Sequence, residues 1–423
     1  MNKTTVIFLL SAILMGCSAT RERKVNKSIV NRINSGYFEN QFTGCIVIDP
    51  ATQDTLFQYN SEKYFLPASN TKIFTLYTAL QLLPEQVPSL KYISKNDTLY
   101  VQGTGDPSSL HPILKDSSVI HFLAKSKNIA LHLTNFVEED FGPGWSWEDY
   151  DQHYAPARSP LPLYGNITSI SKLDTLRVTP SLFRDSIVFS ASGKKRKLHQ
   201  NIFYFYPSRK DTLEVPFIIN DKVTKMFLEN ALDKEVRLIS EMPSGPKDIL
   251  YGIPSDSLYK RMMHESDNFI AEQLLLLSSS SLSDTLNGKI ARDHILANQL
   301  SSLGQPPRWV DGSGLSRYNL FTPESMAVVL QKMFVDLPKD RLFRLFPAGG
   351  ENGTLSDWFK GNPKPYIYAK SGSMGNTYCL SGYLLTNSGK TLIFSFMNNH
   401  HRQSSANLKK EMTKILEMMR DTY

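Results

Sequence analysis

The sequence predicts an α/β fold in which an antiparallel sheet is flanked by helices and interrupted by a β-rich insert. Apolar strand-like segments near both ends of the chain enclose a series of helical segments, which favours one sheet whose first two strands pair with its last three. Between residues 92 and 217 the pattern changes to short alternating segments separated by turns, which is typical of a separate β-rich domain. The length of 423 residues and the apolar content of 41% suit one large domain or two to three smaller ones.

The period of the apolar residues predicts the individual elements. A helix is expected over 27–38, followed by two paired strands over 44–49 and 55–59. Six short strands are expected in the β-rich region, at 98–102, 130–133, 174–178, 187–189, 202–206 and 212–216. Later elements are helices at 258–277, 289–303, 323–334 and 405–419 and strands near 367, 380–386 and 391–397. The four serines at 278–281 predict a loop.

The first seventeen residues have the pattern of an export signal. The segment 6–15 is almost wholly apolar, follows Met-Asn-Lys and is too short to span a membrane. Leu14-Met15-Gly16-Cys17 resembles the lipobox of bacterial lipoproteins, where a peptidase cuts before a cysteine that then carries acyl chains. Residues 1–16 are therefore expected to be a lipoprotein signal peptide and Cys17 a membrane anchor, with an ordinary signal peptide as the alternative.

The composition argues against several classes of protein. A net charge of +7 comes without an Arg-rich stripe or interleaved aromatic residues, so nucleic-acid binding is unsupported. Apart from Cys17, the chain has only Cys45 and Cys379, which are too few for a disulfide-stabilised scaffold. His264, His400 and His401 lack the spacing of metal ligands, so neither a metal nor another cofactor is expected.

Ser69-Asn-Thr-Lys72 places a hydroxyl and an amine three residues apart at the start of a predicted helix, where positions i and i+3 share one face. This arrangement suits a serine nucleophile beside a lysine base. The apolar run after Lys72 would partly desolvate the amine, as such a base requires. The same spacing recurs from Ser169, Ser192, Ser244 and Ser257, and Ser257-Lys260 is the main alternative because it is also expected to be helical.

Two further short motifs follow in order. Ser266-Asp-Asn268 lies within the predicted helix 258–277, and Lys370-Ser-Gly372 ends a strand-like segment. The order Ser-x-x-Lys, Ser-Asp-Asn, Lys-[Ser/Thr]-Gly is typical of penicillin-binding proteins and class A β-lactamases. This set favours Ser69 over Ser257, because Ser257 and Ser266 are too close on one predicted helix to face each other across a cleft.

The first two motifs have expected roles in acyl transfer. Ser69 would attack the scissile carbonyl while Lys72 takes its proton, and water or an amine would later resolve the acyl-enzyme. Ser266 would relay protons toward the leaving group, and Asn268 would hold the substrate amide.

The third motif is expected to bind the substrate. Lys370 would supply positive charge near the substrate carboxylate. Ser371, where threonine is commoner, keeps the hydroxyl, and Gly372 would let the strand approach the peptide as an added strand. The oxyanion would lie between the backbone N–H groups of Ser69 and Ser373.

At these residues the chain resembles the D-alanyl-D-alanine carboxypeptidase/endopeptidase family, the class C low-molecular-mass penicillin-binding proteins of the penicillin-binding protein four type. Five more segments share the resemblance: Gly103-Thr-Gly-Asp-Pro107, Gly144-Trp-Ser-Trp147, Asp311-Gly-Ser-Gly-Leu-Ser316, Gly353-Thr-Leu355 and Leu380-Ser-Gly-Tyr383. The resemblance makes the segment at Asp311 a loop on the cleft rim, and a simple tight turn is the alternative. It implies a transpeptidase/β-lactamase-like domain of residues 25–90 and 240–423, interrupted by an inserted β-rich region at 91–239.

The resemblance also implies a function. The protein would be a serine-type carboxypeptidase or endopeptidase of the cell envelope or periplasm, acting on peptidoglycan peptides that end in D-Ala-D-Ala and inhibited by β-lactams. A β-lactamase-like hydrolase is one alternative, but about 190 residues separate Lys72 from Ser266, room for a whole domain that class A enzymes lack. A catalytically silent peptidoglycan-binding lipoprotein is the other alternative. In the implied fold one strand separates Cys45 from Cys379, so both are expected to be free thiols.

Overall fold

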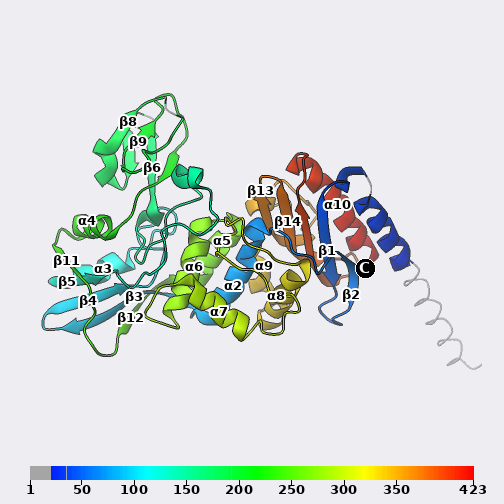
Figure 1. Ribbon diagram of the computed structural model, residues 1–423, viewed down its shortest axis with the longest axis horizontal. Helices are drawn as coiled ribbons and strands as arrows, with labels where there is room; N and C mark the ends of the chain where they lie inside the picture. The colour runs from blue at the N-terminus through cyan, green and yellow to red at the C-terminus, as the bar shows by residue number, and fades with distance from the viewer. Residues whose placement is uncertain (1–20, 35, 173, 192) are drawn as a thin grey trace, which may run out of the picture. The chain divides into compact units, whose positions relative to one another are not determined.

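The computed structural model describes residues 21–423 except 35, 173 and 192 (Figure 1). Predictions for the signal segment and Cys17 therefore fall outside the described residues. Two compact units divide the chain: unit 1 runs up to Ile73 and includes 303–308 and 319–423, and unit 2 holds 74–302 and 309–318. Within the described part, no helix has the length and apolarity needed to cross a membrane.

Unit 1 is built on a five-stranded antiparallel sheet in the order β13-β14-β15-β1-β2. Its strands are β1 (Phe42–Ile48), β2 (Thr55–Tyr59), β13 (Ile367–Met374), β14 (Thr377–Leu385) and β15 (Thr391–Asn399). Strand β1 pairs with β15 from Phe42↔Asn399 to Ile48↔Ile393. The prediction that the first two strands pair with the last three is confirmed.

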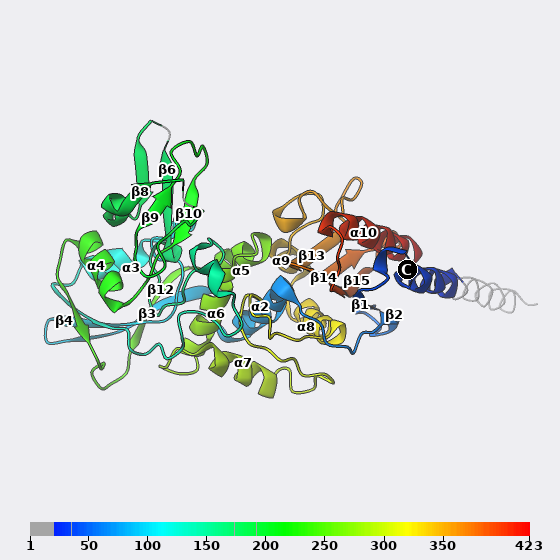
Figure 2. The same cartoon turned by 45° about the horizontal axis from the view of Figure 1, so that its top comes forward.

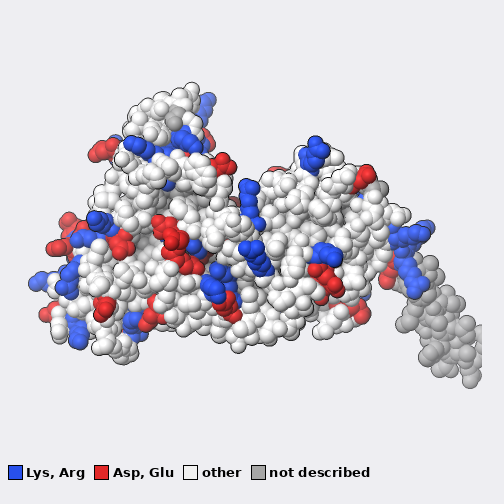
Figure 3. Space-filling view, in the orientation of Figure 1, with Lys and Arg blue, Asp and Glu red and all other residues white. Residues whose placement is uncertain are grey.

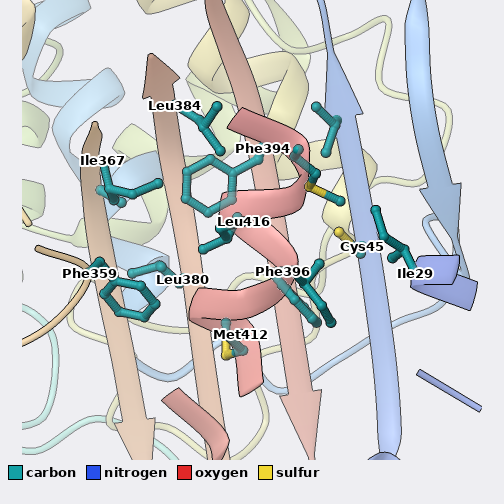
Figure 4. Close-up of a cluster of buried hydrophobic side chains, with 14 of the residues drawn as sticks. Ile29, Cys45, Phe359, Ile367, Leu380, Leu384, Phe394, Phe396, Met412 and Leu416 are labelled. Carbon is teal, nitrogen blue, oxygen red and sulfur yellow. The ribbon is translucent and has the colours of Figure 1, made fainter. Parts of the chain in front are cut away.

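Helices cover both faces of this sheet. On one face, α10 (Ser405–Thr422) points Met412 and Leu416 at the strands, where they pack near Leu380 and Phe394 (Figure 4). Residues 21–33 are also helical and contribute to this core. The other face carries α8 (Pro323–Asp336), whose Leu330 carbonyl accepts a hydrogen bond from the Tyr383 hydroxyl. Because side chains alternate along a strand, neighbouring residues of β14 reach opposite layers. A short helix, α9 (Lys339–Leu345), follows α8.

Cys45 on β1 and Cys379 on β14 are both buried free thiols. Strand β15 lies between their two strands, as the resemblance implied. Burial raises the pKa of each thiol above its ordinary value.

Unit 2 contains three sheets, and strands of all three are labelled in Figure 2. Residues of all three sheets contribute to one hydrophobic core. The five-stranded sheet has the order β11-β5-β4-β3-β12: Val236–Ile239, Asn128–His132, Thr98–Gly103, Gln86–Lys95 and Asp248–Pro254. The other sheets are β10-β6-β7 (Leu213–Pro216, Ile167–Lys172, Leu176–Thr179) and β8-β9 (Ile187–Phe189, Phe203–Phe205). The sequence did not predict β3, β6, β11 or β12 as strands.

Six helices lie wholly or largely in the described part of unit 2. The first, α2 (Thr71–Leu82), starts in unit 1 and continues here. The others are α3 (Ser118–Ala124), α4 (Asp221–Leu232), α5 (Ser255–His264), α6 (Asn268–Ser280) and α7 (Gly288–Ala297). Acidic and basic side chains are interspersed on the face of the molecule that Figure 3 shows.

Two predictions about this region are wrong. The single helix expected at 258–277 is two helices, because the chain turns at Ser266, whose φ is +56°. The loop expected at the serine run is helix instead, since Ser278–Ser280 belong to α6. The hydroxyls of Ser279 and Ser280 donate to carbonyl oxygens one turn back, at 2.7 Å, and so satisfy buried polar groups inside the helix.

Candidate active site

Ser69 lies in a tight turn at the start of α2. A short 3₁₀ helix, Ala68–Asn70, leads directly into α2, and Ala68 has a left-handed backbone with φ of +47°. Both polar atoms of the Asn399 side chain hold Leu66 just before it, with distances of 2.7 Å to its N–H and 3.0 Å to its carbonyl. A strained residue fixed by its surroundings next to a serine is a feature of functional sites.

The amine of Lys72 lies 3.0 Å from the Ser69 hydroxyl oxygen. Lys72 is completely buried and Ser69 is half-buried. The 3₁₀ turn followed by the first turn of α2 thus brings the two residues of the first motif together, in the geometry needed for a nucleophile and its base.

The third motif lies on β13, at the edge of the unit 1 sheet. Lys370 is completely buried, and its ammonium donates a hydrogen bond of 2.7 Å to the carbonyl of Ser371. Burial and the positive charge of Lys72 hold the pKa of Lys370 well below its ordinary value. The two lysines therefore act on one another electrostatically, which the sequence did not predict.

Gly372 lets β13 pack directly on the serine turn. A Cβ atom at this position would lie 2.5 Å from the Pro67 carbonyl oxygen and 2.9 Å from the backbone nitrogen of Ser69. No other residue fits without moving one of the two backbones. The structure thus places Gly372 against the Ser69 turn, and its expected role toward a substrate peptide stays a prediction.

Other residues around this site escaped the sequence analysis. The Ser371 hydroxyl donates to Thr354 at 2.7 Å, and the amide of Asn70 donates to Ser381 at 2.7 Å. Their only signal in the sequence was that Thr354 and Ser381 belong to segments of the family resemblance. Ser373, the last of the predicted binding residues, is exposed on β13.

The second motif is described within unit 2, where Ser266 and Asn268 flank the start of α6. The Asn268 side chain donates to the Tyr154 carbonyl at 2.9 Å. Both motif residues border a cavity of about 230 Å³ that is also lined by His111 and Arg261. Burial lowers the pKa of His111 to about 4, against the opposing charge of Asp267 and with a smaller effect of Arg261, so this ring is neutral near pH 7.

The other Ser-x-x-Lys matches lack the environment of the first. Ser257 lies on α5, but Lys260 is exposed, so its amine is solvated. Lys172 ends a strand, where residues three apart point to opposite faces. Lys247 is ion-paired with an aspartate at 2.6 Å, and Ser192 lies outside the described residues.

The fold is an antiparallel sheet covered by helices on both faces, and the site is a serine at the start of a buried helix with a lysine bonded to it. These features define a class of serine enzymes that carry out acyl transfer with a lysine base. The chain belongs to the D-Ala-D-Ala carboxypeptidase 3 (S13) family, whose model matches residues 25–179 and 251–419. The family resemblance drawn from the motifs is thereby confirmed, and the protein is a serine peptidase.

Similar proteins extend over most of the chain. D-alanyl-D-alanine carboxypeptidase DacB of Haemophilus influenzae is 24% identical over 420 residues, covering 86% of this chain and 87% of the relative. The crystal structure of penicillin binding protein 4 (dacB) from Haemophilus influenzae superposes with a TM-score of 0.70 at 22% identity, covering 90% of this chain and 96% of that one. The same protein complexed with a β-lactam gives a TM-score of 0.63 at 20% identity, covering 90% and 96%.

Proposed function

We propose that this protein is a D-alanyl-D-alanine carboxypeptidase that cleaves peptidoglycan peptides through an acyl-enzyme on Ser69. The observation that carries the proposal is the 3.0 Å contact between the Ser69 hydroxyl and the buried Lys72 amine. Burial favours the neutral form of a lysine amine, which is the form that accepts a proton. The relative from Haemophilus influenzae bears the name of this activity.

The reaction has two steps. The Ser69 oxygen attacks the carbonyl of the penultimate D-alanine as Lys72 accepts the hydroxyl proton, and the terminal D-alanine leaves with a proton on its amine. Water then attacks the ester, which releases the shortened peptide and returns the proton to Ser69. In this scheme Ser266 passes protons to the leaving amine and Asn268 holds the substrate amide, assignments that rest on the motif alone.

The end of β13 at Ser373, which is exposed at the edge of the sheet, suits a peptide substrate. An edge strand offers unpaired backbone groups, so a peptide can bind as an additional strand next to Ser371 and Ser373. The backbone N–H groups of Ser69 and Ser373 are the candidates for stabilising the oxyanion. A β-lactam would enter by the same route, and the family relative from Haemophilus influenzae has been crystallised with one.

We also propose that the protein works in the cell envelope, anchored through acyl chains on Cys17. The lipobox-like sequence before Cys17 supports this, and several acyl chains would give stable anchoring without a spanning helix. Metabolic labelling with a fatty acid analogue should mark the wild-type protein and leave a Cys17→Ser variant unmarked.

Labelling with a fluorescent penicillin tests the acyl-enzyme. We expect a covalent band with the wild-type protein and none with Ser69→Ala, because the completely buried Lys72 amine lies 3.0 Å from the Ser69 hydroxyl. The matched control is Ser257→Ala, which changes the serine of the rival motif and should label like the wild type. A band that persists in Ser69→Ala and disappears in Ser257→Ala would overturn the assignment.

The same experiment separates the alternatives. A band that decays within minutes would indicate a β-lactamase, whereas a stable band together with release of D-alanine from a diacetyl-Lys-D-Ala-D-Ala peptide indicates a carboxypeptidase. A folded wild-type protein with neither band nor D-alanine release would leave the silent binding lipoprotein as the better account.

A further inference from the structure

The segment from Asp311 to Ser316 is a buried, fixed loop of unit 2. Asp311, Ser313 and Ser316 are all inaccessible to solvent, which is unusual for a polar loop. The Asp311 carboxylate accepts hydrogen bonds from the N–H groups of Gly314 and Ser316, at 2.9 and 2.6 Å, and from the Trp145 indole at 2.9 Å. A loop held in this way has one conformation rather than several.

One side of this loop is attached to α6. Glu272, one turn beyond Asn268, accepts a hydrogen bond of 2.7 Å from the backbone N–H of Ser313. Next to it, a Cβ atom on Gly312 would lie 2.4 Å from the carbonyl oxygen of Ala271. Glycine is therefore required for the loop backbone to touch the helix backbone.

The other side of the loop is attached to α2. The hydroxyl of Thr75, one turn beyond Lys72, donates to the Gly312 carbonyl at 2.6 Å. The ring of Phe74 packs edge-on against Trp309 with centroids 5.5 Å apart, and the Trp309 indole donates to the Asp311 carbonyl at 2.7 Å. The same loop thus connects two helices that each begin at a motif of the proposed site.

Glu272 is surrounded by charges from several elements. Asp311 faces it from the loop, Arg292 acts on it from α7, and Arg158 approaches its carboxylate to 3.7 Å. Arg158 makes its shorter ion pair, 2.9 Å, with Glu138 instead. Burial and the charge of Asp311 raise the pKa of Glu272 to about 7, against the effects of Arg158 and the Ser313 hydrogen bonds.

We propose that the Asp311–Ser316 loop is a brace between α2 and α6, and that Glu272 and Thr75 are positioning residues for acylation. The inference rests on the proposed function, because α2 carries Lys72 and α6 begins at Asn268. Neither positioning residue belongs to the reacting groups. Each holds a helix one turn away from a motif, where a displacement of about 1 Å can slow a reaction about a hundredfold.

The first test replaces the carboxylate. Glu272→Ala should slow acylation by a fluorescent penicillin about ten- to hundredfold, with the loss in the covalent step rather than in initial binding. Glu272→Gln should restore the rate to within about threefold, because its amide oxygen can still accept the Ser313 hydrogen bond. The matched control is Glu138→Ala, which removes the partner of Arg158 without touching the loop and should leave the rate within about threefold.

A second pair of variants tests the other helix. Thr75→Val removes the hydroxyl that reaches the loop, whereas Thr78→Val removes a buried hydroxyl that donates to Phe74 within α2 itself. Acylation should slow in Thr75→Val and stay near wild type in Thr78→Val. Hydrogen exchange at 74–80 and 266–272 should rise in Thr75→Val and Glu272→Ala only.

These measurements separate the two proposals. If the wild-type protein is never acylated, the proposed function is wrong. The brace can still be tested by hydrogen exchange, because that measurement does not depend on enzyme activity. Equal rates and equal exchange in Thr75→Val and Thr78→Val would overturn the brace, as would slow acylation that Glu272→Gln fails to restore.

Discussion

The first motif derives its chemistry from the surroundings of two lysines. Lys72 and Lys370 are both completely buried in unit 1. Taking an ammonium group out of water and placing it near another positive charge both favour the neutral amine. The sequence predicts which residues carry the reaction, but their burial is a property of the packed protein.

At the scale of single residues, the carboxyl of Glu272 predicts a pH dependence of stability. Its pKa is raised to about 7 from an ordinary value of 4.5, so the folded protein binds this proton more tightly than the unfolded chain does. The stabilisation is complete below about pH 4.5 and is lost as pH rises to about 7. The free energy of unfolding of the wild type should fall by up to about 3 kcal/mol across this range, relative to Glu272→Gln, whose side chain does not titrate.

Thermal unfolding of both proteins at intervals from pH 4 to 8 measures this effect. The difference between the two unfolding temperatures isolates Glu272, because the other titrating groups are common to both proteins. Parallel curves over the whole range would show that the Glu272 carboxyl keeps an ordinary pKa in the folded state.

At the scale of elements, the break between α5 and α6 explains the middle residue of the second motif. The Asp267 carboxylate accepts a hydrogen bond of 3.0 Å from the N–H of Ile270 and pairs with Arg261 at 3.0 Å. Asp267 is thus the N-cap of α6. The apolar residues of 258–277 continue with a helical period across this break, so the sequence pattern predicts a single helix. The pattern contains no information about the left-handed φ of Ser266, at which the helix is interrupted.

The cap predicts separate effects on stability and activity. Asp267→Ala should cost about 1 kcal/mol of unfolding free energy and slow acylation, because α6 then frays at its first residue, Asn268. Asp267→Asn keeps a capping oxygen and should restore most of the rate. The control is Asn287→Ala at the N-cap of α7, whose side chain accepts the N–H of Lys289.

Urea unfolding and penicillin acylation of these variants give the two measurements. Asn287→Ala should lose a similar unfolding free energy while its acylation rate stays at the wild-type value. Equal losses of rate in the two Ala variants would mean that the Asp267 cap has no special role at the motif.

At the scale of the whole molecule, segments from both ends of the chain complete one sheet. Strand β1 is inserted between β15 and β2, so Cys45 pairs with Phe396, and the Cys379 thiol contacts the Leu66 carbonyl, each more than 300 positions away in the sequence. Burial raises the pKa of both thiols. Only the opening of this sheet would expose them as reactive thiolates.

Thiol reactivity should therefore report the unfolding of unit 1. In a soluble form that starts at residue 21, Cys45 and Cys379 should be inert to Ellman's reagent in the native state and should both react in concentrated urea. Their reaction should follow the same urea transition as the circular dichroism of the sheet. Rapid labelling of either thiol in native protein would contradict the closed sheet.

The sequence by itself determined the family, the order of the three motifs and the pairing of the terminal strands, because each depends on short patterns of residue type. It predicted β2 and β8 at their observed bounds, and it located α8 and α10 from their amphipathic period. These features depend on local preference and on which side chains avoid water.

Only the tertiary structure decided which groups meet. The burial of Lys370, the packing of Gly372 on the Ser69 turn and the attachment of Glu272 and Thr75 to one loop all join residues far apart in the sequence. The serines at 278–280 show the same limit, since they lie in a buried helix where the hydroxyls of Ser279 and Ser280 donate to carbonyl oxygens one turn back. Burial and long-range contact set the chemistry of a side chain, and neither can be read from its neighbours in the chain.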